Sequence, residues 1–131
     1  MAAPASEQII RQMFAIFTDF STSLDQLRGF LTPDYQQIVD GRTLTLNDFL
    51  THAQALRETL QSLEITVERI ICQEDMAATV HVARAIRPSG YISTIRVIAF
   101  FQLREGRIAL VDELTHVLEG NSEDKTLGSL Q

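Results

Sequence analysis

Asp112 and His116 are the two residues whose types and spacing are best suited to chemistry. They lie four positions apart in the segment 108–116, where apolar and polar residues alternate as in a half-buried β-strand. That alternation puts both side chains on the apolar face of the strand. A carboxylate in apolar surroundings can act as a general acid or base, and a neighbouring imidazole can orient or assist it. We therefore expect Asp112 and His116 to line a cavity.

Each of these residues also has a purely structural explanation. An inward carboxylate at position 112 can be tied to Arg69, Arg84 or a helix N–H group, which would leave it no catalytic role. A histidine at position 116 can be a core residue whose hydrogen bonds are satisfied. The sequence leaves both alternatives open.

The elements that must position this pair are three helical segments and six extended ones. The first helix begins at Ala5 or Ser6 and ends at the cluster 21–23, and a short second helix covers 24–31. Extended segments at 35–39 and 42–44 flank Asp40 and Gly41. Thr45 is the expected N-cap of a third helix that runs to about residue 62. Four strands follow, at 63–73, 76–87, 91–104 and 107–118.

Short turns between these four strands indicate an antiparallel meander and fix its register. We take 74–75 and 105–106 as two-residue loops and 88–90 as a three-residue loop. Asp112 is then expected across from Ala99, and Ala99 across from Ala78, so that two small residues leave space beside a carboxylate. The polar residues expected on this inner face are Arg69, Arg84, Asp112 and His116.

Other residues are candidates for contact with a ligand in the same cavity. Asp40, beside Gly41, is either a third acid/base group or a turn residue. Tyr35 offers a ring with a hydroxyl tip, and His52 lies at the edge of the inner stripe of the third helix. The remaining candidates for substrate contact are Arg84, Arg69, Phe101 and Ala99, of which the arginines could clamp a carboxylate.

Composition restricts the classes of function. The chain has 131 residues, which is one domain, and a formal net charge of −6, which argues against nucleic acid as a partner. No apolar run is long enough for a membrane span, and the N-terminal residues lack the features of a signal peptide. The single cysteine, Cys72, fits a reducing cytoplasm. No two histidines have metal-ligand spacing and no glycine-rich phosphate loop is present, so neither a metal nor a cofactor is expected.

The order of elements resembles the nuclear transport factor 2-like superfamily. This is the cystatin-like α+β cone of ketosteroid isomerases and SnoaL-like polyketide cyclases, in which N-terminal helices pack in a curved antiparallel sheet. The resemblance covers about residues 6–120 and rests on the 39–41 corner, the 106–108 turn and Asp112 in the last strand. The tail 115–129 is similar to tails of uncharacterised bacterial SnoaL-like proteins. Residues 1–131 are thus expected to form a single SnoaL-like domain with a polar C-terminal tail at 121–131.

The resemblance implies an enzyme that does acid/base chemistry on a hydrophobic, oxygen-bearing small molecule. Asp112 with His116 is similar to the late-strand aspartate and histidine of SnoaL-like cyclases, and Asp40 occupies a place similar to the proton shuttle of ketosteroid isomerases. The tyrosine that those isomerases carry on the first helix is absent here. Isomerase, cyclase and hydrolase chemistry all stay open, as does a non-catalytic ligand-binding or dimerisation module of the same fold.

The outer face of the sheet is the expected partner surface. The register puts an apolar row there, flanked by a polar row in which His81 pairs with Glu68. An apolar strip on an uncovered sheet face usually marks an interface, so we expect a homodimer through this face. Leu127 and Leu130 of the tail are candidates to dock on the partner. The residues expected in the apolar row are Cys72, Ala77, Phe100 and Val111, with Ile70 and Ile98 beside them.

Overall fold

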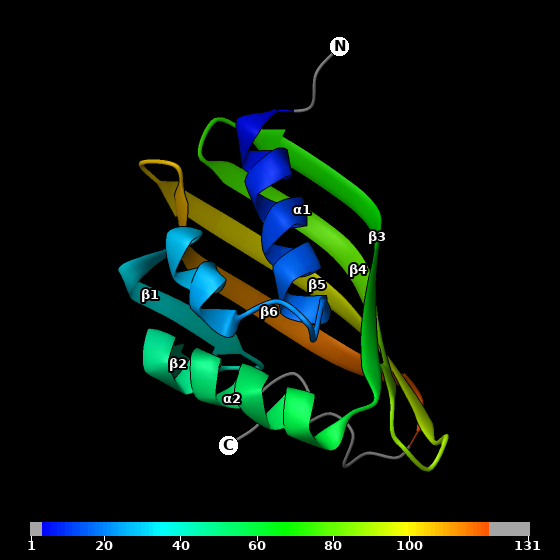
Figure 1. The fold of residues 1–131 in the computed structure, drawn as a ribbon. Helices are drawn as coiled ribbons and strands as arrows, with labels where there is room; N and C mark the ends of the chain where they lie inside the picture. Colours follow the sequence, from blue (N-terminus) through cyan, green and yellow to red (C-terminus); the bar gives the residue numbers. More distant parts are fainter. Residues whose placement is uncertain (1–3, 121–131) are drawn as a thin grey trace.

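The structure is a computed structural model that describes residues 4–120, so the expected C-terminal tail lies outside the described residues. Two helices lie on one face of a six-stranded curved sheet (Figure 1). The sheet order is β2-β1-β6-β5-β4-β3. The elements are α1 (Ala5–Thr18), a 3₁₀ helix (Leu24–Gly29), β1 (Leu31–Val39), β2 (Arg42–Thr45), α2 (Leu46–Thr59), β3 (Ser62–Gln73), β4 (Met76–Ile86), β5 (Ile92–Arg104) and β6 (Arg107–Glu119).

The predicted fold class is confirmed, with one difference in strand direction. The sheet pairs its strands antiparallel except β1 with β6, which run parallel because β1 enters the sheet beside the last strand of the meander. The second helical segment is shorter than expected, since β1 already begins at Leu31.

Local sequence chemistry explains where the helices begin and end. Thr45 and Asp48 form a capping box at the start of α2, which confirms Thr45 as the N-cap. At the end of α1 the carboxylate of Asp19 accepts hydrogen bonds from Ser21 N, Ser21 Oγ and Thr22 Oγ1 at 3.0, 2.6 and 2.7 Å. These bonds stabilise a non-helical turn at 19–22 in place of another turn of helix, so α1 ends there.

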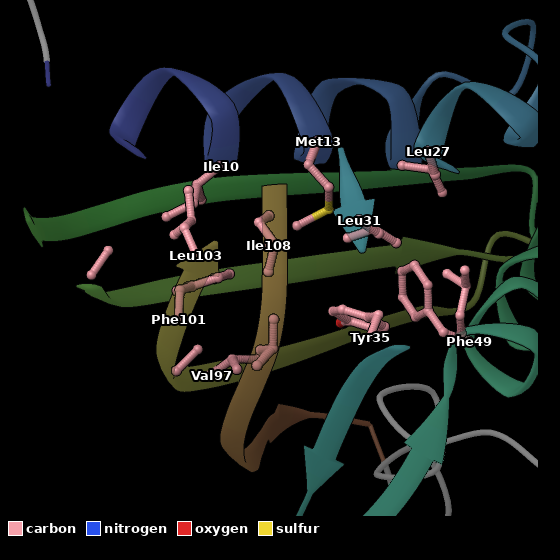
Figure 2. Close-up of a cluster of buried hydrophobic side chains, with 14 of the residues drawn as sticks. Ile10, Met13, Leu27, Leu31, Tyr35, Phe49, Val97, Phe101, Leu103 and Ile108 are labelled. Atoms are coloured by element: carbon pink, nitrogen blue, oxygen red, sulfur yellow. The ribbon is translucent and has the colours of Figure 1, made fainter. Parts of the chain in front are cut away.

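The core lies between the helices and the concave face of the sheet. Ile10 and Met13 of α1 point toward Phe101, Leu103 and Ile108, as Figure 2 shows. The inner face expected for β5 is confirmed, because its alternate residues are all buried: Ile95, Val97, Ala99, Phe101 and Leu103.

The faces expected for β6 are wrong beyond its third residue, because a β-bulge changes the phase of the strand. Leu103 pairs with Ile108, but Gln102 pairs with Leu110, so Ala109 is the extra residue. One extra residue moves every following side chain to the opposite face. Val111 and Glu113 are therefore buried, and Asp112 and His116 are exposed on the outer face.

The faces expected for β4 and for much of β3 are also wrong. The turn at 88–90 forms as expected, with the Arg87 N–H donating to Tyr91 O at 3.0 Å. This turn pairs Ala99 with Thr79 and not with Ala78, and the one-residue difference exchanges the two faces of β4. His81 is consequently buried inside the cone. In β3, a second bulge at Glu68 separates the pairs Val67–His81 and Arg69–Val80.

The apolar rows on the two faces of the sheet change accordingly. Four residues expected outside face inward and belong to or pack against the core: Ile70, Cys72, Ala77 and Val111. Phe100 and Ile98 do lie outside, where they are 39% and 59% exposed. They are joined on that surface by other exposed apolar side chains, Ile71, Met76 and Leu114.

Candidate functional site

A cavity of about 100 Å³ lies inside the cone, between the two helices and the inner face of the sheet. Its wall is mainly aromatic and aliphatic, with contributions from α1, α2 and every strand except β2. Phe49 stacks on Phe17, with ring centroids 5.6 Å apart. Figure 2 shows Phe49 beside Tyr35, and these two ring centroids are also 5.6 Å apart. The polar side chains in the wall are those of Tyr35, Gln37, His52, His81 and Glu113.

Glu113 is the carboxylate of this cavity, and the bulge at Ala109 is what turns it inward. Gln37 Nε2 donates a hydrogen bond to Glu113 Oε1 at 2.5 Å, and the Tyr35 hydroxyl lies 3.5 Å from Gln37 Oε1. The chain Tyr35–Gln37–Glu113 therefore runs along the inner face from β1 to β6. Gln37 holds the carboxyl group in one orientation and leaves its second oxygen for a ligand.

Burial determines the protonation of Glu113 and Tyr35. It raises the pKa of Glu113 to about 7, because removal from water penalises the charged form. The hydrogen bond from Gln37 acts in the opposite direction, and the nearby Asp40 and Asp112 add to the increase. Burial, followed by the charge of Glu113, holds the pKa of Tyr35 well above its usual range, so its hydroxyl keeps its proton.

The cavity wall has no basic counter-ion among the residues that the structure describes. Burial lowers the pKa of His81 to about 4, so its imidazole is neutral near neutral pH. His52 also lies in the wall and is 3% exposed. A cavity of this kind disfavours a ligand carboxylate, which would enter without a cation to pair with.

The structure divides the residues predicted for the site into two groups. Tyr35, His52 and Phe101 lie in the cavity wall, and Ala99 is buried on the inner face beneath it. The other predicted residues, which are Asp112, His116, Arg69, Arg84 and Asp40, do not line the cavity.

Asp112 and His116 do not form the predicted pair inside the cone. Both are exposed on the convex face, because the bulge at Ala109 changes the phase of β6. Arg69 and Arg84 are exposed too, and Arg84 Nη1 lies 3.1 Å from Glu64 Oε1. Arg84 is exposed because the two faces of β4 are exchanged, and Arg69 is exposed because it follows the bulge in β3.

Asp40 serves the corner between β1 and β2. Its φ angle is 50°, and its carboxylate accepts hydrogen bonds from Thr115 N at 2.9 Å and Thr115 Oγ1 at 2.5 Å. Its own N–H donates to Glu113 O at 3.0 Å. Asp40 therefore fastens this corner to β6 next to Glu113, which supports the turn interpretation.

Sequence reasoning did not single out Gln37, His81 or Glu113. Gln37 had a visible signal, because it shares a strand face with Tyr35 two positions earlier. Glu113 and His81 each lie one position out of phase with the expected register. No residue type near Ala109 predicts the bulge that shifts Glu113.

Comparisons with known proteins agree with this architecture. The family model described as the SnoaL-like domain matches residues 10–111. The chain therefore belongs to the SnoaL-like domain family. It is 61% identical over 126 residues to the uncharacterized protein C11D3.04c of Schizosaccharomyces pombe, covering 96% of this chain and 97% of that protein.

Solved structures show the same fold at low sequence identity. AclR from Streptomyces galilaeus, described as a putative hydroxylase, has a TM-score of 0.75 and 14% identity, over 96% of this chain and 86% of AclR. IdmH from Streptomyces antibioticus, described as a putative polyketide cyclase, has a TM-score of 0.72 and 20% identity, over 95% of this chain and 97% of IdmH. Within residues 4–120, neither helix is long and apolar enough to cross a membrane.

Proposed function

We propose that this protein is an acid/base enzyme that acts on a small, hydrophobic, oxygen-bearing molecule in the cone cavity, with Glu113 as the proton-transfer group. The observation that carries the proposal is the position of Glu113: a buried carboxyl in an apolar cavity, held by Gln37, with a pKa of about 7. A carboxyl with a pKa near the working pH is present in both its acid and base forms, which is what proton transfer in both directions requires.

The chemistry needs only groups that the chain supplies. Ionised Glu113 takes a proton from a carbon atom beside a carbonyl, and the electron pair of the C–H bond moves toward the carbonyl oxygen. In an isomerisation, protonated Glu113 then returns the proton to another atom of the substrate. In a cyclisation, the carbanion attacks a second carbonyl of the same molecule, the electron pair of that C=O bond moves to its oxygen, and protonated Glu113 returns the proton to this alkoxide. A dry cavity favours both steps because water does not compete for the proton.

The size and charge of the cavity restrict the substrate. A volume of about 100 Å³ is smaller than the roughly 300–1,000 Å³ of a pocket for a drug-sized ligand. An apolar cavity of about 150 Å³ is enough for benzene. The proposed substrate is therefore a neutral molecule no larger than about one six-membered ring.

The test is exchange of the protons beside the carbonyl of cyclohexanone in D₂O, followed by proton NMR. Wild-type protein should raise the exchange rate above that of buffer, and Glu113→Gln should lower the protein-dependent rate by about a hundredfold or more. Asp112→Asn is the matched control, because it removes a neighbouring carboxylate that faces outward. Exchange that survives in Glu113→Gln, or that wild type does not accelerate, contradicts the proposal.

The alternative function is a non-catalytic module, and the outer face of the sheet is the observation that favours it. Large apolar side chains gather there, with Ile71 74%, Leu114 64% and Ile98 59% exposed. Exposed apolar side chains gathered on one face mark an interaction surface. We infer that a second copy of the chain covers this face, which is compatible with catalysis inside the cone.

A further inference from the structure

His81 is a second polar group in the cavity wall that the proposed proton transfer does not use. It comes from β4, and its ring packs against Phe14 of α1, with centroids 4.8 Å apart. The imidazole is 5% exposed and lines the same cavity as Glu113. Its Nδ1 atom lies 2.8 Å from Thr79 Oγ1. Within residues 4–120, Nε2 has no protein hydrogen-bond partner.

Thr79 determines which ring nitrogen carries the proton. The neutral imidazole has one N–H, and Thr79, which is 2% exposed, has a hydroxyl hydrogen that needs an acceptor. If Thr79 donates to Nδ1, the hydroxyl hydrogen is satisfied and the imidazole proton is on Nε2. If Nδ1–H donates to Thr79 instead, the buried hydroxyl hydrogen has no acceptor, which is unfavourable. The Nε2–H tautomer is therefore favoured, with Nδ1 held by Thr79.

The sheet register separates His81 from Glu113 across the cavity. Thr79, Ala99 and Glu113 pair in one row across β4, β5 and β6. Two strand spacings amount to roughly 9.5 Å between the backbones at the two ends of that row. Ala99 is the middle residue of that row, and its inward neighbours on β5, Val97 and Phe101, line the cavity between the two polar ends. His81 stands one inward position further along β4, where it pairs with Val97.

We propose that His81 is a ligand-binding residue whose Nε2–H donates a hydrogen bond to a ligand oxygen on the side of the cavity opposite Glu113. The ligand class that fits is a neutral molecule with two acceptor oxygens separated by a small ring or a short apolar chain. One oxygen faces Glu113 and the other faces His81. This inference deepens the proposed function, since it concerns what the same cavity recognises.

The test compares two probes that differ in one oxygen, cyclohexane-1,4-dione and cyclohexanone, titrated into the protein and followed by NMR. Wild type should bind the dione roughly fivefold more tightly, which is the effect of one additional net hydrogen bond. His81→Phe keeps a ring against Phe14 and should bind both probes with equal affinity. Thr79→Val keeps the volume, removes the hydroxyl that fixes the tautomer, and should reduce the preference.

Two results overturn this inference. One is a wild-type protein with no preference for the dione, which includes failure to bind it. The other is a preference that persists unchanged in His81→Phe. Nitrogen-15 NMR of the wild-type imidazole is a measurement that needs no variant: protonated Nε2 is the expected result, and protonated Nδ1 contradicts the assignment.

Failure of the proposed catalysis is distinguishable from failure of this inference. Glu113→Gln keeps an N–H donor at that end of the cavity and should still prefer the dione, although its exchange activity is lost. A Glu113→Gln variant with the preference and without exchange supports both proposals. Wild type with the preference and without exchange supports His81 alone.

Discussion

At the scale of single residues, Glu113 and His81 make opposite contributions to the pH dependence of stability. The pKa of Glu113 is raised by folding from 4.5 to about 7, so the folded state binds its proton more tightly than the unfolded chain does. Its contribution is fully present below the unfolded pKa and is lost as pH rises through the folded pKa. The pKa of His81 is lowered from 6.5 to about 4, so its contribution increases with pH across that interval.

In wild type, the contribution of Glu113 to stability is lost as pH rises from about 5 to about 8. We predict that Glu113→Gln abolishes this loss. Relative to wild type, the variant should gain on the order of 3 kcal/mol in unfolding free energy across this window. The measurement is the urea midpoint of both proteins at the two pH values. His81 is retained in both, so its opposite contribution cancels in the difference. An equal pH dependence in the two proteins would show that Glu113 has an ordinary pKa.

At the scale of elements, Arg57 fastens the end of α2 to the last turn of α1 and to the segment that follows it. Its guanidinium donates to the backbone oxygens of Ile16 and Asp19, both at 2.8 Å, and to that of Thr22. The charge also lies 5.5 Å from the centroid of the Phe20 ring. These contacts hold the helices together over the end of the cavity that Leu56 and Leu60 line.

We predict that Arg57→Lys destabilises the fold by about 1–3 kcal/mol, because a lysine ammonium cannot direct its donors to three carbonyls in the planar arrangement of a guanidinium. Arg11→Lys is the matched control, since Arg11 makes an exposed contact with Glu7 within α1. Urea unfolding of both variants measures the effect. Equal midpoints for Arg57→Lys and wild type would mean that these carbonyls are satisfied equally well without Arg57.

Most elements could be predicted from the sequence, while the faces of several strands could not. Thr45 and the apolar repeat around Ile10 and Met13 carry local signals for helices, and each turn carries its own residues. The bulges at Glu68 and Ala109 arise from the fit of each strand to its neighbour. The residues of one strand do not by themselves predict that fit. The single extra residue at Ala109 nevertheless decides that Glu113, and not Asp112, faces the cavity.

At the scale of the whole molecule, the two faces of the sheet differ in the function that we propose for each. The concave face holds the cavity, and the convex face presents the apolar side chains that we assign to a homodimer. Ile98 and Leu114 are cross-strand neighbours near the middle of that face. A charge placed there would be buried without a partner in such an interface.

We predict that Ile98→Glu converts a dimer into a monomer, as measured by light scattering coupled to size-exclusion chromatography. The control is Thr51→Glu, which places the same charge on an exposed position of α2, on the other side of the sheet. A wild-type protein that is monomeric at high micromolar concentration would contradict the assignment of this face to a second copy.

Glu113, and not Asp112, is the buried acid/base group that we propose for this protein. The most direct test is a titration of the side-chain carboxyl carbons by carbon-13 NMR, with Glu113→Gln and Asp112→Asn used to assign the two signals. We expect a Glu113 signal with a pKa of about 7. A Glu113 signal that titrates near 4.5, the ordinary glutamate value, would contradict the claim.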